Sequence, residues 1–185
     1  WTNVRSAKPV YEGHNQTVEP LNGHYNLLDN SVVKWQADLA EKYGVYGFCY
    51  YHYWFEGRKI LEKPAENLLK NKSINKKFCF CWANHSWRKT WNGTMEMLIE
   101  QSYGIEDEWN EHFNYLQAFF QDERYIKINN MPIFMIFKPG EIPFLDERIK
   151  YYDNKCKELG FNGIYIIESI DINGKNAKSL YSKGV

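Results

Sequence analysis

Four short apolar segments, separated by helical patterns, constrain the fold of this chain more than any other feature. We expect strands over residues 45–53, 77–82, 132–137 and 163–170. Each segment is apolar along nearly its whole length, which is typical of a strand buried on both faces of a parallel sheet. Strands that alternate with helices predict an α/β fold in which helices cover the sheet.

Apolar residues recur at helical spacing in the segments between these strands. The pattern predicts helices from residue 30 or 31 to 43, and over 64–69, 106–121 and 145–159, with a last helix near Asn176. Gly44 and Gly160 directly follow two of these helices, at the position where a left-handed residue commonly ends a helix. Residues 1–30 and 83–105 show no sustained period, so we expect loops there.

Two architectures fit a parallel sheet of this kind, an open doubly wound sheet and a part of a (β/α)8 TIM barrel. The chain has no GxGxxG or P-loop motif, which disfavours a nucleotide-binding domain of the first type. A full barrel needs ~250 residues, and the 185 residues of this chain hold about four of its strands. We therefore expect one domain, 1–185, that is a partial barrel, and self-association through its open sheet edges.

The composition argues against several classes of function. Lys plus Arg and Asp plus Glu both number 23, without a basic stripe, so we expect no nucleic-acid partner. No apolar run approaches the ~20 residues of a membrane span. The cysteines form no CxxC pair and the histidines no HExxH motif, so we expect reduced buried thiols, a cytoplasmic location, and neither a metal nor another cofactor. We expect His112, four residues after Glu108 on a predicted helix, at the surface.

The segments that leave the predicted strands mix aromatic rings with Asn and His. Ligands of α/β proteins bind at the carboxyl ends of parallel strands. Rings beside hydrogen-bonding groups suit a sugar, whose C–H faces stack on rings and whose hydroxyl groups need partners. Packing between loop and barrel is the alternative for each ring. We predict one sugar-binding rim from the following residues: His52, Tyr53, Trp54, Trp82, Asn84, His85, Trp87 and Trp91.

Glu168 follows an apolar run near the end of the last predicted strand. A carboxylate in such surroundings has a perturbed pKa and can serve as an acid, a base or an acceptor for a sugar hydroxyl. The alternative is an ion pair with a nearby cation such as Lys138. We take Glu168 as the acid/base candidate, although glycosidase chemistry needs two carboxylates and the sequence pairs none.

Several longer motifs resemble one known family, the WbsX-type proteins. The resemblance rests on Trp1-Thr2-Asn3-Val4, Gly13-His14-Asn15-Gln16, the run from Tyr43 to Phe55, Cys81-Trp82-Ala83-Asn84, Trp91-Asn92-Gly93, Gln101-Ser102-Tyr103 and Arg124-Tyr125-Ile126-Lys127. Such proteins are described as glycosyltransferases of lipopolysaccharide and polysaccharide synthesis. They are similar to the endo-α-mannosidases of glycoside hydrolase family 99, which are TIM barrels. The resemblance implies a carbohydrate-active enzyme that transfers or hydrolyses glycosyl groups of bacterial surface polysaccharide.

This chain departs from the family pattern in three places. Family members usually have a strand before the position of Trp1. They also continue past residue 185 to an Asn-Glu-Trp-x-Glu-type segment, and the related mannosidases keep their catalytic carboxylates there. Their usual Trp-Ala-Asn-Glu ends in His85 here, which makes His85 the second catalytic candidate. Two interpretations stay open, the sugar-facing part of an enzyme and a noncatalytic glycan-binding module or inactive fragment.

Overall fold

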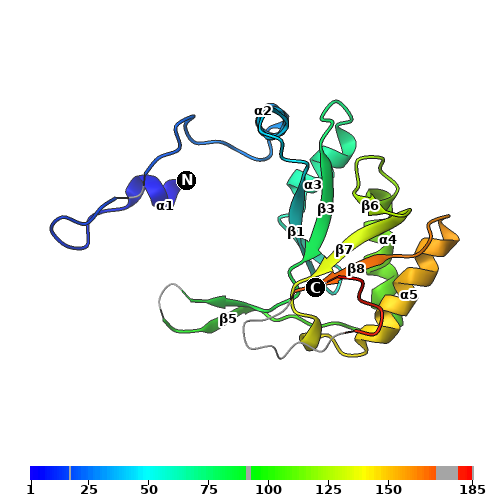
Figure 1. The fold of residues 1–185 in the computed structure, drawn as a ribbon. Coiled ribbons are helices and arrows are strands. Elements are labelled where there is room, and N and C mark those ends of the chain that lie inside the picture. Colours follow the sequence, from blue (N-terminus) through cyan, green and yellow to red (C-terminus); the bar gives the residue numbers. More distant parts are fainter. Residues whose placement is uncertain (17, 91–92, 170–178, 185) are drawn as a thin grey trace.

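The computed structural model describes residues 1–16, 18–90, 93–169 and 179–184 (Figure 1). Its centre is a mixed sheet in which four strands run parallel, each beside its predecessor among the four. The predicted set of four parallel strands in chain order is confirmed. Their bounds are as follows: β1 (Gly47–Phe55), β3 (Lys77–Trp82), β7 (Met131–Ile136) and β8 (Tyr165–Glu168).

Two short antiparallel strands extend the sheet through tight hairpins, β2 (Arg58–Ile60) after β1 and β6 (Lys127–Ile128) before β7. Both two-residue turns have positive φ at each position, as type I′ turns require: 43° and 85° at Glu56 and Gly57, and 50° and 57° at Asn129 and Asn130.

A separate hairpin of β4 (Trp87–Lys89) and β5 (Glu96–Ile99) lies within the segment that the sequence predicts to be loop. The predicted loop over residues 83–105 is therefore wrong in this part.

The predicted helices are present within one or two residues at each end: α2 (Asn30–Lys42), α3 (Lys63–Lys70), α4 (Glu106–Phe120) and α5 (Leu145–Glu158). The Asp29 carboxylate caps α2 by accepting a hydrogen bond from the Ser31 N–H at 2.8 Å. Gly44 follows this helix with a φ of 73°. The sequence did not predict two short elements, α1 (Thr2–Ser6) and the 3-10 turn η1 (Pro139–Glu141). The helix predicted near Asn176 lies outside the described residues.

The main core lies between the sheet and the helices α4 and α5. Because successive side chains of a strand point to opposite faces, Phe78, Phe80 and Phe134 face the helices and are almost completely buried. The other face of the sheet is partly open among the described residues. Cys49 is exposed there, so the predicted burial of all four cysteines is wrong at this position.

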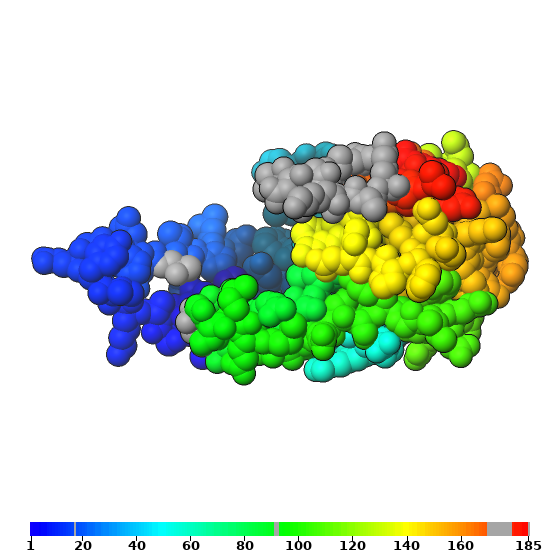
Figure 2. All heavy atoms as spheres, turned by 90° about the horizontal axis from the view of Figure 1, so that it is seen from below, coloured from blue at the N-terminus to red at the C-terminus, as the bar shows by residue number. Residues whose placement is uncertain are grey.

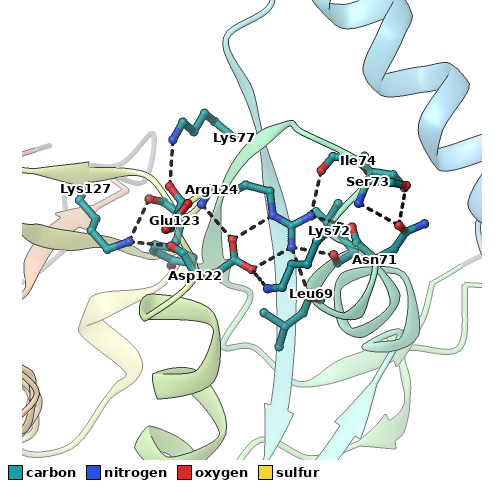
Figure 3. Close-up of polar contacts among 12 residues, drawn as sticks. Leu69, Asn71, Lys72, Ser73, Ile74, Lys77, Asp122, Glu123, Arg124 and Lys127 are labelled. Atoms are coloured by element: carbon teal, nitrogen blue, oxygen red, sulfur yellow. Dashed lines mark hydrogen bonds and ion pairs between the residues drawn. The ribbon is translucent and has the colours of Figure 1, made fainter.

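Arg124 joins the amino-terminal side of the sheet to the end of α3 (Figure 3). Its guanidinium donates to the Asp122 carboxylate at 2.9 and 2.8 Å, and to the carbonyl oxygens of Leu68, Asn71 and Ile74 at 2.8, 2.9 and 2.8 Å. The last carbonyl groups of a helix lack partners within the helix, so the arginine caps α3.

Burial raises the pKa of the Asp122 carboxyl group, but the hydrogen bonds from Arg124 and Lys72 outweigh this effect. The pKa of Asp122 therefore lies well below its usual range.

The N-terminal segment projects from the body of the molecule as an arm, drawn in blue in Figures 1 and 2. Figure 2 also shows residues of the β4–β5 hairpin (green) beside the segment that follows β7 (yellow), at the carboxyl end of the parallel strands. Among the described residues, no helix has the length and apolar character needed to cross a membrane.

Candidate functional site

The predicted rim residues of β1 divide between the two faces of the sheet. Tyr53 is half-buried on the open face, whereas His52 and Trp54 are 4% and 3% exposed. The Trp54 ring stacks on the ring of His112 from α4 at a centroid distance of 4.7 Å. The expectation that all three β1 side chains face one rim is therefore wrong for His52 and Trp54. Strand alternation directs these two toward the helix layer.

His52 and Trp54 belong to a buried polar network between β1, α4 and α5. The Nε2 atoms of His52 and His112 are 2.8 Å apart, and His112 Nδ1 lies 2.9 Å from both Arg148 Nη2 and the Tyr152 hydroxyl. Arg148 also forms an ion pair with Glu108 at 3.1 Å. His112 is 0% exposed, so its predicted surface position is wrong. Its side of α4 faces the sheet.

The arginine determines the proton positions of both histidines. A guanidinium only donates hydrogen bonds, so His112 Nδ1 must accept and its proton must reside on Nε2. That proton is donated to His52 Nε2, which leaves the His52 proton on Nδ1. Burial is the main cause that lowers both pKa values, to about 3 for His52 and well below the usual value for His112. Both rings are therefore neutral near pH 7.

Trp82 and Asn84 lie at the end of β3 but are buried. The Trp82 ring contacts the Arg148 guanidinium at 4.5 Å and His112 edge-on at 4.9 Å. The Asn84 amide donates to the Lys138 carbonyl at 2.7 Å, and its oxygen accepts from the Lys138 N–H at 2.8 Å. The Tyr103 hydroxyl donates to the Asn84 carbonyl at 2.9 Å. Asn84 thus clamps the ends of β3 and β7 together. The predicted concave surface shared by Trp82, Asn84 and Tyr53 is not found.

Glu168 is also buried, at 3% exposure. It lies opposite Ile136 in the β7–β8 register, and both of its carboxylate oxygens accept from the Ser179 N–H at 3.1 and 3.2 Å. Lys138, the cation considered as its partner, forms an ion pair with Glu141 at 2.7 Å. The contacts of Glu168 therefore fasten the end of β8 to the segment around residue 179, away from Tyr53.

The other predicted residues do come together, on the open face at the carboxyl end of the strands. The Tyr53 and Trp87 rings meet edge to face at 5.1 Å, and His85 lies 5.5 Å from Phe137. Tyr51 contacts both Tyr53 and Phe137 at 6.3 Å. We call this cluster the aromatic rim: Tyr51, Tyr53, His85, Trp87 and Phe137. Trp91, also predicted here, lies outside the described residues.

The sequence interpretation missed two members of the aromatic rim. Tyr51 is 59% exposed and lies two residues before Tyr53, on the same face of β1. The period-two alternation of a strand could have identified it. Phe137 directly follows β7, and it was assigned to the strand itself.

A hollow of about 420 Å³ adjoins the aromatic rim, lined by residues of the β4–β5 hairpin together with His85 and Trp87. Partial burial, reinforced by the Lys138 cation and opposed by the Glu141 carboxylate, lowers the pKa of His85. His85 is therefore neutral near pH 7 and can donate one hydrogen bond and accept another. Among the residues that the structure describes, no group of three or more His, Cys, Asp or Glu side chains could hold a metal ion.

Comparisons with known proteins find relatives in sequence and one similar fold. The protein WxcX of Xanthomonas campestris pv. campestris strain B100 is 31% identical over 168 residues, as is its counterpart in a second strain. The matched region covers 90% of this chain but 24% of WxcX, so the chain spans about a quarter of these relatives. A solved structure described as a glycoside hydrolase-like protein has a TM-score of 0.54 at 14% identity, covering 83% of this chain and 47% of that one. The similarity at this identity concerns the fold alone.

The sequence model of the family described as Glycosyltransferase WbsX matches residues 1–184. This match extends over nearly all of the chain, from the N-terminal arm to the segment after β8. The chain therefore belongs to the WbsX glycosyltransferase family.

Proposed function

We propose that this chain supplies the sugar-facing surface of a carbohydrate-active protein, with the aromatic rim as its glycan contact. The observation that carries the proposal is the position of Tyr53, His85 and Trp87 at the carboxyl ends of neighbouring parallel strands, beside a hollow of about 420 Å³. Exposed rings can stack on the C–H face of a pyranose. His85 and the Tyr hydroxyls supply hydrogen bonds to its hydroxyl groups.

The proposed architecture of the intact protein is a (β/α)8 barrel. Four parallel strands that pair in chain order, rather than reversing about a central strand, support it. In that arrangement the open face of the sheet would line the barrel interior, and the aromatic rim would border its mouth.

We further propose that the longer protein acts in the cytoplasm on bacterial surface polysaccharide, by glycosyl transfer or by hydrolysis. Membership of a glycosyltransferase family supports the glycosyl-transfer part of this proposal. Of the two catalytic candidates, His85 is better placed, because it adjoins the hollow and is partly exposed. Both oxygens of Glu168 are bound to the Ser179 N–H, and its side chain is buried.

A glycan array of bacterial O-antigens and capsular polysaccharides, probed with the 185-residue chain, tests the binding part of the proposal. For the best binder, Trp87→Ala should weaken affinity by roughly 1–3 kcal/mol, the scale of one lost ring contact. Trp35→Ala is the matched control, because Trp35 is an exposed tryptophan on α2. Equal affinities of the Trp87 variant and the parent chain would refute the aromatic rim as the binding surface.

A noncatalytic glycan-binding module is the second candidate, favoured by His85 at the position where the family resemblance implies a carboxylate. Turnover in the longer protein separates the two candidates. If this position serves acid–base catalysis, His85→Glu should raise turnover, since such groups contribute ~10²–10⁴-fold. A change in affinity with no turnover in either form would support the binding module.

A further inference from the structure

The hollow beside the aromatic rim is built by one short stretch of the chain. All of the described residues that line it lie between His85 and Leu98, in the β4–β5 hairpin and the two residues before it. Figure 1 shows the strand β5 of this hairpin extending away from the main sheet. The hollow is therefore a local feature of the hairpin, and its lining can be analysed by itself.

A bulge in the hairpin lies beside a ring and a cation that line the same hollow. The pairing of β4 with β5 shifts by one residue between Trp87 and Arg88, which leaves Leu98 as an extra residue on β5. Successive side chains of a regular strand point to opposite faces, yet Trp87 and Arg88 both line the hollow. A bulge re-aims side chains in this way, and bulges are frequent next to active sites. The hollow thus combines a ring for stacking with a guanidinium group.

Arg88 brings the charge of this hollow. Among the described residues that line it, Arg88 is the only Lys, Arg, Asp or Glu. A guanidinium has five N–H groups and no acceptor. The one hydrogen bond of the Arg88 side chain within the described residues joins Nη1 to the Met95 carbonyl at 3.4 Å. Its remaining donors are available to a ligand.

Two carboxylates near the rim already have cations as partners. Glu96 forms an ion pair with Lys89 across the hairpin at 3.6 Å, and Glu141 forms one with Lys138 at 2.7 Å. Glu100, which follows β5, does not line the hollow. In the part of the chain that the structure describes, the arginine of the hollow therefore has no carboxylate as its partner.

Two other polar side chains of the lining can also donate hydrogen bonds. The Ser86 hydroxyl oxygen accepts from the Gln101 N–H at 2.9 Å, and within the described residues its own hydrogen has no acceptor. The Nδ1 atom of His85 is buried, so Nε2 is the ring nitrogen that remains for a ligand. With its proton on Nε2, the neutral ring donates there. Donors without a carboxylate among them suit an anion.

We propose that the hollow takes a sugar that carries an acidic group, a carboxylate or a phosphate, with Arg88 as the partner of that group and Trp87 stacked on the sugar ring. The inference rests on the proposed function, because it names the class of glycan that the aromatic rim contacts. An arginine can bind two oxygens of a carboxylate or phosphate at once. The ring and the cation belong to consecutive residues, so one acidic sugar unit can contact both.

Removal of the acidic group from the glycan tests the inference on the unaltered chain. One probe is a capsular polysaccharide that contains uronic acid, compared with its carboxyl-reduced form. The other is an O-antigen that carries phosphate monoesters, compared with the same polymer after phosphatase treatment. We expect the acidic form of one pair to bind roughly tenfold or more tightly than its neutral form, the scale of hydrogen bonds to a charged group. The pair that shows the preference identifies the acidic group.

A variant of the arginine tests which residue recognises the acidic group. Arg88→Gln should weaken binding of the acidic form by roughly tenfold and change binding of the neutral form by less than about twofold. Lys34→Gln is the matched control, because it removes the same charge from an exposed position on α2 and should change neither. Trp87→Ala should weaken both forms, since the ring contacts the sugar whatever its charge.

The outcomes separate this inference from the proposed function. Equal affinities for the acidic and neutral forms would overturn the acidic sugar, as would an acid preference that survives in Arg88→Gln or equal losses for both forms in that variant. In each of these cases a loss in Trp87→Ala would still support the aromatic rim as the glycan contact. If neither form binds, or if Trp87→Ala changes neither affinity, the proposed function fails and the acidic sugar fails with it.

Discussion

Replacing Arg124 by Met should destabilise the fold more than any surface change, because the guanidinium is the centre of the cap on α3. The side chain is 7% exposed and bonds a carboxylate, Asp122, that is itself 2% exposed. Removing one partner of a buried ion pair costs about 3–5 kcal/mol, since the other charge stays buried. The carbonyls of Leu68, Asn71 and Ile74 lose their donor as well. Lys72 still contacts Asp122, which limits the loss, so we expect about 4 kcal/mol.

Urea unfolding measured by circular dichroism, with linear extrapolation to water, gives the free energy of unfolding for each variant. Lys34→Met is the matched control, because the Lys34–Asp38 pair on α2 is mostly exposed and should change stability by less than ~1 kcal/mol. Replacing both partners, Arg124→Met with Asp122→Leu, should cost less than Arg124→Met alone because no charge is left unpaired. A loss below ~1 kcal/mol for Arg124→Met would refute the reasoning.

Two further predictions concern the buried polar groups. Burial holds the pKa values of His52 and His112 below the usual ~6.5. Below pH ~6.5 the histidines of the unfolded chain therefore bind protons that the folded chain does not bind. The free energy of unfolding falls as the pH drops through this range. His52→Gln should reduce the slope of unfolding free energy between pH ~6.5 and 5 by up to ~1.4 kcal/mol per pH unit, and an unchanged slope would contradict a neutral buried His52. Asn84→Ala leaves the N–H and C=O of Lys138 without their side-chain partner, so thermal unfolding should show a loss of roughly 1–3 kcal/mol; an unchanged midpoint would contradict the clamp.

The order of helices and strands could be predicted because each segment carries its own period. The face of each side chain could not. β1 is aromatic at both odd and even positions, so nothing in its composition distinguishes Tyr53, on the open face, from Trp54, which packs on α4. Which face the helices cover is decided by α4 and α5, more than 50 residues further along the chain.

The structural role of Asn84 could not be predicted from the sequence for a related reason. A polar residue directly after a buried strand is a sound signal that a polar partner exists. The partner is the backbone of Lys138, 54 residues away, which no local pattern indicates. The prediction that His85 and Trp87 belong to the rim rested on their place after a strand end, and in the structure both are partly exposed. Tyr51 was not predicted there, because it lies inside the apolar run.

The two type I′ hairpins bear on the order in which the sheet assembles. Each turn uses only two residues, so β1–β2 and β6–β7 can form in ~1–10 μs without waiting for distant parts of the chain. The parallel contact of β1 with β3 must instead close a loop that includes α3, at a cost in chain entropy. β1 and β7 can thus meet β3 as preformed ribbons, whose twist and register the turns have already set. β3, which has no hairpin of its own, is then the strand that takes its register from both neighbours.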